Sequence, residues 1–147
     1  MLFAAVGDTG YNIVLLLHVL GMFVGFAPAW LTPVLVRLTA NGDRAAAEAL
    51  EMAIVRLSLP FLGVAGLLGF GLAGMSDRVY RVAQPWLMTS ALLWLVVLAV
   101  MLFVTRPAIK AFGNGDANAR KIVMAGTGVT HLILVVTLYL MIWKPGL

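Results

Sequence analysis

The segment from Tyr11 to Arg37 constrains the fold most, because it carries over twenty nearly uninterrupted apolar residues and no full charge before Arg37. Roughly 20 apolar residues at a rise of 1.5 Å cross the hydrocarbon core of a bilayer. A soluble domain carries about a quarter charged residues, whereas this chain is 11% charged and 63% hydrophobic. The sequence therefore predicts an integral membrane protein.

Four apolar segments are separated by short polar ones. The predicted spans are residues 12–36, 57–75, 86–105 and 122–143. Asn41-Gly42-Asp43 and Asn114-Gly115-Asp116 are typical of turns, and Arg106-Pro107 predicts the end of the third span, followed by a loop over residues 107–121. We expect an all-α, four-transmembrane-helix bundle that forms a single domain over residues 1–147.

Residues 44–56 have a helical period with charges at Arg44, Glu48, Glu51 and Arg56. This pattern predicts an aqueous extension of the second helix, either lying on the membrane surface or leading straight into the span. Its charges are interpreted as a solvated face.

The basic residues predict the orientation in the membrane. Seven Lys and Arg residues flank the two turn-containing connections, whereas Arg78, Arg81 and Lys144 lie on the opposite side. The side richer in Lys and Arg is cytoplasmic, so both termini and the 76–84 loop are expected outside a bacterial cytoplasmic (inner) membrane. The basic residues set topology and do not indicate nucleic acid. The start, MLFAAVGDTG, has no signal-peptide pattern and is interpreted as mature sequence.

His18 and His131 are the strongest titratable candidates inside the spans. An ionisable side chain in hydrocarbon is a functional-site hypothesis by default. His18 is expected about 13 Å below the outer surface and His131 about 18 Å below it, at 1.5 Å per residue. Given uncertain helix ends, we expect the two imidazoles at one level of the bundle.

Glycines near both histidines favour a flat cofactor. Gly21 and Gly25 follow His18 on one helix face, and Gly128 precedes His131 by three residues. Bare backbone beside an imidazole suits a porphyrin, and histidine is a standard axial ligand of haem iron. The sequence therefore predicts a haem b site with His18 and His131 as metal ligands, serving electron transfer or a membrane redox assembly. Its propionates would lie near Arg78, Arg81 and Lys144.

Other interpretations remain open. Each histidine alone can simply bond a neighbour's carbonyl or hydroxyl, and Met22 near His18 leaves a His/Met pair or copper passage possible. The row Ala65, Gly69, Ala73 allows close helix packing, so a non-catalytic accessory or scaffold subunit could use Gly66 or Gly69 against a larger membrane partner or a second copy. All six acidic residues lie outside the spans, which argues against a proton relay of buried carboxylates, and the absence of Cys excludes thiol chemistry. If the protein is an enzyme, we expect a membrane oxidoreductase.

The stretch LLLHVLGMFVGFAPAWLTPVLVRL, with its LHxLG pattern, resembles small bacterial membrane families. It is similar to the copper-resistance protein D domain, to the HemJ-like membrane protoporphyrinogen oxidases, and to related uncharacterised membrane proteins. The resemblance covers mainly the first and last helices. It implies that His18 matches a haem-associated histidine and Arg37 the nearest basic residue. The oxidases also rely on a lysine in a middle helix, and residues 57–75 and 86–105 contain none.

Overall fold

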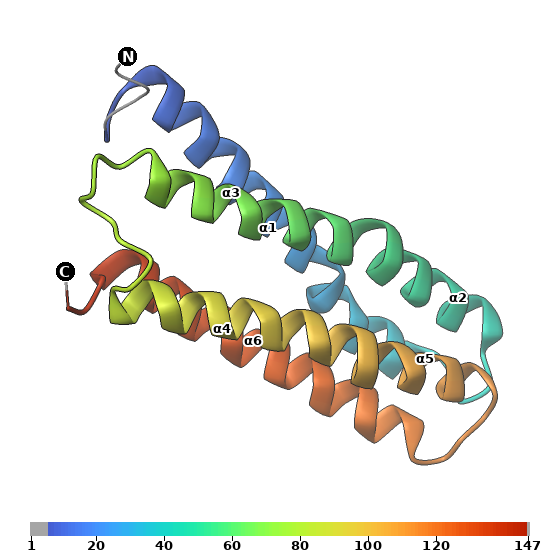
Figure 1. The fold of residues 1–147 in the computed structure, drawn as a ribbon. Coiled ribbons are helices and arrows are strands. Elements are labelled where there is room, and N and C mark those ends of the chain that lie inside the picture. The colour runs from blue at the N-terminus through green and yellow to red at the C-terminus, as the bar shows by residue number, and fades with distance from the viewer. Residues whose placement is uncertain (1–5, 147) are drawn as a thin grey trace.

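The computed structural model describes residues 6–146, which fold into four long helical rods with no strand among them (Figure 1). The first rod is α1 (Thr9–Leu38). The second joins α2 (Arg44–Ala53), the π-helical turn η1 (Ile54–Ser58) and α3 (Leu59–Gly74). The third joins α4 (Pro85–Ala99), the π-helical turn η2 (Val100–Thr105) and α5 (Arg106–Gly113), and the fourth is α6 (Ala119–Trp143).

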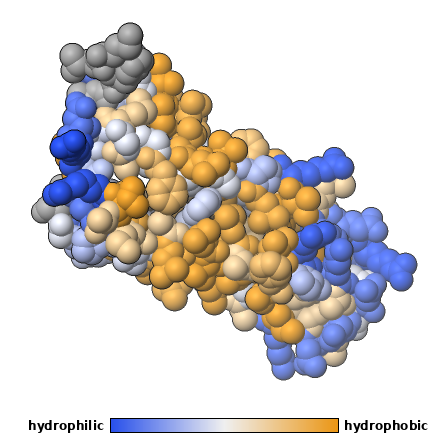
Figure 2. All heavy atoms as spheres, in the orientation of Figure 1, coloured by the Kyte–Doolittle hydropathy of each residue, from blue (hydrophilic) through white to orange (hydrophobic). Residues whose placement is uncertain are grey.

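All four rods are long and apolar enough to cross a membrane. Hydrophobic side chains cover the middle of the face shown in Figure 2, and hydrophilic ones gather at its two ends. This distribution is that of a multi-pass membrane protein, because lipid chains contact the middle and water the ends. The prediction of an all-helical protein with four spans is confirmed.

The rods pair as two hairpins. One contains α1 and α2–η1–α3, and the other contains α4–η2–α5 and α6 (Figure 1). The two Asn-Gly-Asp turns meet at one end, where the Gly42 amide donates to the Phe112 carbonyl at 2.9 Å. Gly42 and Gly115 have φ of 90° and 87°, a region that favours glycine. Asp43 caps α2 by accepting from the Ala46 amide at 3.0 Å.

Two boundary predictions have different outcomes. The second helix leads straight from Arg44 into the membrane, which is one of the two expected arrangements. The predicted loop over residues 107–121 is wrong, because α5 continues the third helix to Gly113. Pro107 follows closely on the π-helical turn η2, an irregularity in the backbone hydrogen bonding that accommodates a residue with no amide to donate. Ile109 and Phe112 are completely buried, so tertiary packing holds α5 helical.

On the predicted solvated face of α2 and η1, Arg44, Glu48 and Arg56 are exposed, whereas Glu51 is half-buried and belongs to an ion-pair cluster. The Glu51 carboxylate accepts from Arg106 Nε at 2.9 Å and lies 3.1 Å from Lys110 Nζ. This cluster joins the two hairpins beyond the apolar segments. Sequence periodicity assigned Glu51 to a polar face, but it carried no information that α5 would lie opposite α2.

Within the first hairpin, glycines allow α1 to lie close to α3. A Cβ placed on Gly21 would lie 3.0 Å from the Ala65 Cβ, and one on Gly25 would lie 2.6 Å from Leu62 Cγ. Close backbone approach through small residues is the usual packing mode in lipid. This contact fixes the height of α1 against α3, and therefore the position of His18.

Candidate functional site

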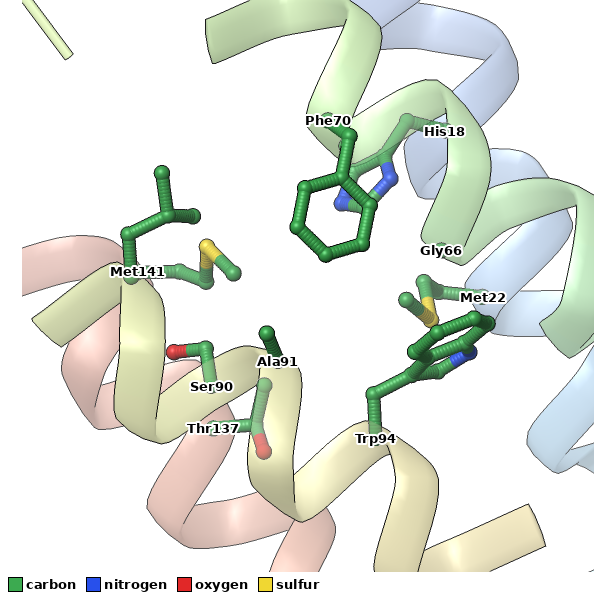
Figure 3. A pocket seen from close by; sticks show the side chains of 11 residues that line it. His18, Met22, Gly66, Phe70, Ser90, Ala91, Trp94, Thr137 and Met141 are labelled. Atoms are coloured by element: carbon green, nitrogen blue, oxygen red, sulfur yellow. The ribbon is translucent and has the colours of Figure 1, made fainter. Parts of the chain in front are cut away.

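A cavity lies between the two hairpins, at the end away from the Asn-Gly-Asp turns (Figure 3). All four membrane spans contribute to its lining, which consists almost wholly of apolar atoms. The lining residues are His18, Met22, Gly66, Gly69, Phe70, Leu87, Ser90, Ala91, Trp94, Thr137 and Met141. Its volume of about 40 Å³ is room for a few water molecules, since one water needs roughly 10–15 Å³ by a comparable measure.

His18 enters this cavity with one ring nitrogen already occupied. Its Nδ1 lies 2.7 Å from the backbone carbonyl oxygen of Ala65 in α3. Because a carbonyl oxygen only accepts, Nδ1 carries the proton, and in the neutral ring Nε2 keeps its lone pair. A histidine that binds a metal usually donates its other ring N–H to a carbonyl or carboxylate in this way. The arrangement therefore prepares His18 Nε2 to act as a ligand or acceptor.

Gly69 makes this hydrogen bond possible. It lies one helical turn beyond Ala65, and a Cβ added to it would lie 3.1 Å from His18 Cε1 and 3.4 Å from Nδ1. The imidazole thus occupies the space where a side chain would stand. The small-residue row in the second span is therefore explained by a seated histidine as well as by helix packing.

Trp94 repeats the same arrangement from the opposite hairpin. Its indole Nε1 donates to the Leu62 carbonyl at 2.8 Å, and its ring fills the space beside Gly66, four residues after Leu62. Two ring N–H groups, from His18 and Trp94, thus bond α3 carbonyls across glycines. The prediction that Gly66 or Gly69 packs against a partner is wrong, because the chain's own rings occupy both.

His131 does not lie beside His18, so the expected common level is wrong. The His131 ring packs on Trp30, with ring centroids 4.4 Å apart. Trp30 follows His18 by twelve residues in α1, which is roughly 18 Å along a helix. On α6 the cavity is lined by Thr137 and Met141, both more than a turn beyond His131. The structure does not bring the two imidazoles together, because α1 and α6 pair at a different register from the one assumed.

The glycines that were expected to lie beside a cofactor are also separated in the structure. Gly21 and Gly25 face Ala65 and Leu62 of α3, so they serve helix packing. Gly128 is exposed, and a Cβ added to it would point into open space. None of these three glycines lines the cavity. The glycines that do are Gly66 and Gly69, both in the glycine-rich second span.

Arg78 and Arg81 lie in the connection between α3 and α4, at the end of the bundle nearer the cavity, and both are exposed. At the same end Lys144 Nζ lies 5.4 Å from the Tyr80 ring centroid. None of these three cations lines the cavity.

Several cavity residues were not singled out from the sequence, above all Trp94, Phe70, Thr137 and Met141. An aromatic or a methionine in an apolar span gives no periodic signal that separates a cavity wall from lipid contact. One clue was available for Trp94, since its indole N–H requires a partner when it lies inside a membrane.

The cavity has few polar groups, and apolar side chains surround them. No group of three His, Cys, Asp or Glu side chains suited to a metal occurs within residues 6–146. The lining side chains that could ligate a metal offer one imidazole nitrogen, two thioether sulfurs and two hydroxyls. One of these hydroxyls, that of Ser90, already donates a hydrogen bond to the Trp86 carbonyl at 2.7 Å. Met22 and Met141 enter from opposite sides in the view of Figure 3.

Comparison with known proteins found no matching family model, no matching curated protein and no matching solved structure. The site is therefore interpreted from its own geometry.

Proposed function

We propose that this protein is a small b-type-haem-binding membrane protein in which His18, and not His131, supplies the axial ligand. The observation that carries the proposal is the 2.7 Å contact between His18 Nδ1 and the Ala65 carbonyl. It leaves Nε2 as the free Lewis base of a ring that lines an apolar cavity made by all four spans. Haem iron bound there would supply one-electron chemistry, suited to electron transfer or to the membrane part of a redox assembly.

The lining of the cavity suits a haem chemically, but the cavity is too small to hold one. An apolar lining with few polar groups is typical of cofactor sites, whose volumes are about 300–1,000 Å³, whereas this cavity has about 40 Å³. Haem binding therefore requires the hairpins to separate at this end. Met22 and Met141 line the same cavity and would be the other candidate ligands of the iron. Arg78 and Arg81, in the connection between α3 and α4, would be the cations for the propionates.

We place the protein in a bacterial cytoplasmic membrane with both termini outside. The seven basic residues of the two turn-containing connections lie in the halves of their rods nearer the Asn-Gly-Asp turns or in the connections themselves. The excess of Lys and Arg favours the cytoplasmic side for this end. The cavity then opens in the outer half of the membrane. Reporter fusions to each terminus test this orientation. A C-terminal reporter that is active in the cytoplasm contradicts it.

The decisive experiment compares His18→Ala with His131→Ala in detergent-purified protein. We expect wild type and His131→Ala to show the reduced-minus-oxidised spectrum of a b-type haem, and His18→Ala to lose it. Helical circular dichroism on each sample controls for folding. Folded wild-type protein that takes up no haem contradicts the proposal, as does equal loss of haem in both variants.

Copper(I) binding is a second candidate, favoured by the presence of Met22, Met141 and one imidazole in a single cavity. Thioethers and imidazole are ligands that suit this ion. It predicts stoichiometric copper by elemental analysis, and loss of copper in Met22→Leu and Met141→Leu. Haem with no copper in the same sample decides against it.

A further inference from the structure

The indole of Trp94 stands directly beside the His18 cavity. Trp94 and Gly66 both line this cavity, and a Cβ added to Gly66 would overlap ring atoms of the indole. Gly69, three residues further along the same helix, leaves room for the imidazole of His18 in a similar way. The two flat rings therefore occupy one face of α3 (Figure 3). If the indole left its place, the vacated space would join the cavity, because Gly66 bounds both.

The indole is held across the two hairpins by one hydrogen bond and one ring contact. Its Nε1 donates to the Leu62 carbonyl at 2.8 Å, and its ring meets Phe70 edge-on, with centroids 6.2 Å apart and planes at 75°. Trp94 is partly exposed at the surface of the bundle, whereas Leu62 and Val97 of the same two rods are 0% and 1% exposed. Because exposed side chains change rotamer far more readily than enclosed ones, Trp94 is a wall residue that can turn without repacking the core.

Buried apolar clusters close the cavity along the bundle axis. Leu62 and Val97 belong to the cluster on the side of the Asn-Gly-Asp turns, and Ala73, Trp86 and Leu87 belong to a second cluster at the opposite end. A passage along the axis would expose one of these clusters, which costs much more than a single hydrogen bond. Trp94 stands between the clusters, where α4 contacts α3, so its rotation would open the cavity sideways toward lipid.

We propose that Trp94 is a lateral gate of the His18 cavity, which opens toward lipid between α3 and α4 when the indole releases the Leu62 carbonyl. The loss of this hydrogen bond keeps the open state minor. Opening uncovers the backbone of α3 at Gly66, so the gate suits a flat, largely apolar ligand that arrives from the bilayer. That this ligand is haem rests on the function proposed above, whereas the gate itself rests on the contacts of Trp94.

Labelling of His18 by diethyl pyrocarbonate in micelles tests the gate without any cofactor. This small reagent modifies a neutral imidazole nitrogen, and mass spectrometry reports each histidine separately. When opening is rapid, the labelling rate follows the population of the open state. Trp94→Phe keeps an aromatic ring and removes the bond to Leu62, so we expect His18 to be labelled about fivefold faster, the equivalent of one hydrogen bond. The labelling rate of His131, which packs on Trp30, should change by less than about twofold.

Gly66→Ala provides an independent test, because it keeps the indole and displaces it. We expect faster labelling of His18 in this variant, with Gly63→Ala on the open face of α3 as its control. Trp30→Phe is the control for Trp94→Phe, since Trp30 does not line the cavity, and it should leave the labelling rate of His18 unchanged.

Helical circular dichroism confirms that each variant is folded. An unchanged labelling rate at His18 in both folded test variants overturns the gate. An equal rise at His18 and His131 also overturns it, because the whole bundle would then have loosened. Faster labelling of His18 alone, in a protein that takes up no haem, supports the gate and contradicts only the haem function.

Discussion

The two ends of the bundle hold the hairpins together in different ways. At the charged end, Glu51 bonds Arg106 and Lys110, the Gly42 amide bonds the Phe112 carbonyl, and Gly113 packs on Ala47. At the other end the hairpins surround a cavity, and the indole of Trp94 crosses to Leu62. The charged end therefore acts as a fixed clamp. Any opening that admits a cofactor is expected at the cavity end.

Gly113→Leu should lower the free energy of unfolding most, because Gly113 packs directly on Ala47 at the charged end. A Cβ there would lie 2.6 Å from the Ala47 Cβ, and neither group can rotate away. We expect a loss of about 3 kcal/mol in the free energy of unfolding, at the upper end for overpacking, measured by denaturant titration in micelles. Gly71→Leu is the control, since Gly71 faces open space, and a similar loss there would remove the distinction.

Gly66→Ala tests the cavity end, where we expect a smaller effect. The added methyl group collides with the Trp94 ring, which can turn away at the cost of its 2.8 Å bond to Leu62. The expected loss is about 1–2 kcal/mol, the scale of one hydrogen bond with its packing. Gly63→Ala is the matched variant on the open face of α3. A Gly66→Ala protein as stable as Gly63→Ala contradicts the role of Trp94.

Glu51→Gln weakens the clamp by removing one charge at constant shape. Since the Glu51 side chain is 24% exposed and its two partners are more exposed, solvent screens the interaction. We expect a loss of about 1 kcal/mol or less, read from the same titration. The exposed Glu48 provides Glu48→Gln as the control on the same helix. Equal effects at both positions would show that the cluster does not join the hairpins.

The pH dependence of the clamp should be the smallest effect. The hydrogen bond from Arg106 is the main cause that lowers the pKa of Glu51, burial opposes it, and Lys110 adds to the lowering. A lowered folded-state pKa means that the stabilisation is present above about pH 4.5, the ordinary value, and is lost as pH falls through the folded-state pKa. Unfolding midpoints of wild type and Glu51→Gln should therefore converge in acid. Parallel curves down to about pH 3 exclude this linkage.

The membrane architecture followed from the sequence because hydrocarbon imposes a simple rule. About twenty apolar residues must form a helix, since no other backbone arrangement of a single segment satisfies its polar groups in lipid. The turns at Gly42 and Gly115 were equally local, and both are present as predicted. The loop assigned to residues 107–121 failed because the burial of Ile109 and Phe112 against another helix has no local signature.

The candidate site was only half predictable. His18 was found because an ionisable group in a long apolar run is rare and costly. Its proposed partner His131 was chosen by counting residues from helix ends, and a shift in helix register moves such a position by many ångströms. Residue spacing gave no means of knowing that Gly21 would face α3 while Gly69 received the imidazole.

The sequence by itself determined that this chain has four helices able to span a membrane and that both histidines lie within apolar segments, because hydropathy and chain length act through local physics. Tertiary structure alone decided which groups meet. The Ala65 carbonyl fixes the proton of His18 on Nδ1. The Trp94 indole bonds Leu62 from the opposite hairpin, and the His131 ring packs on Trp30 and not beside the cavity. These contacts join residues far apart in the chain, and they depend on how the helices pack and at what height.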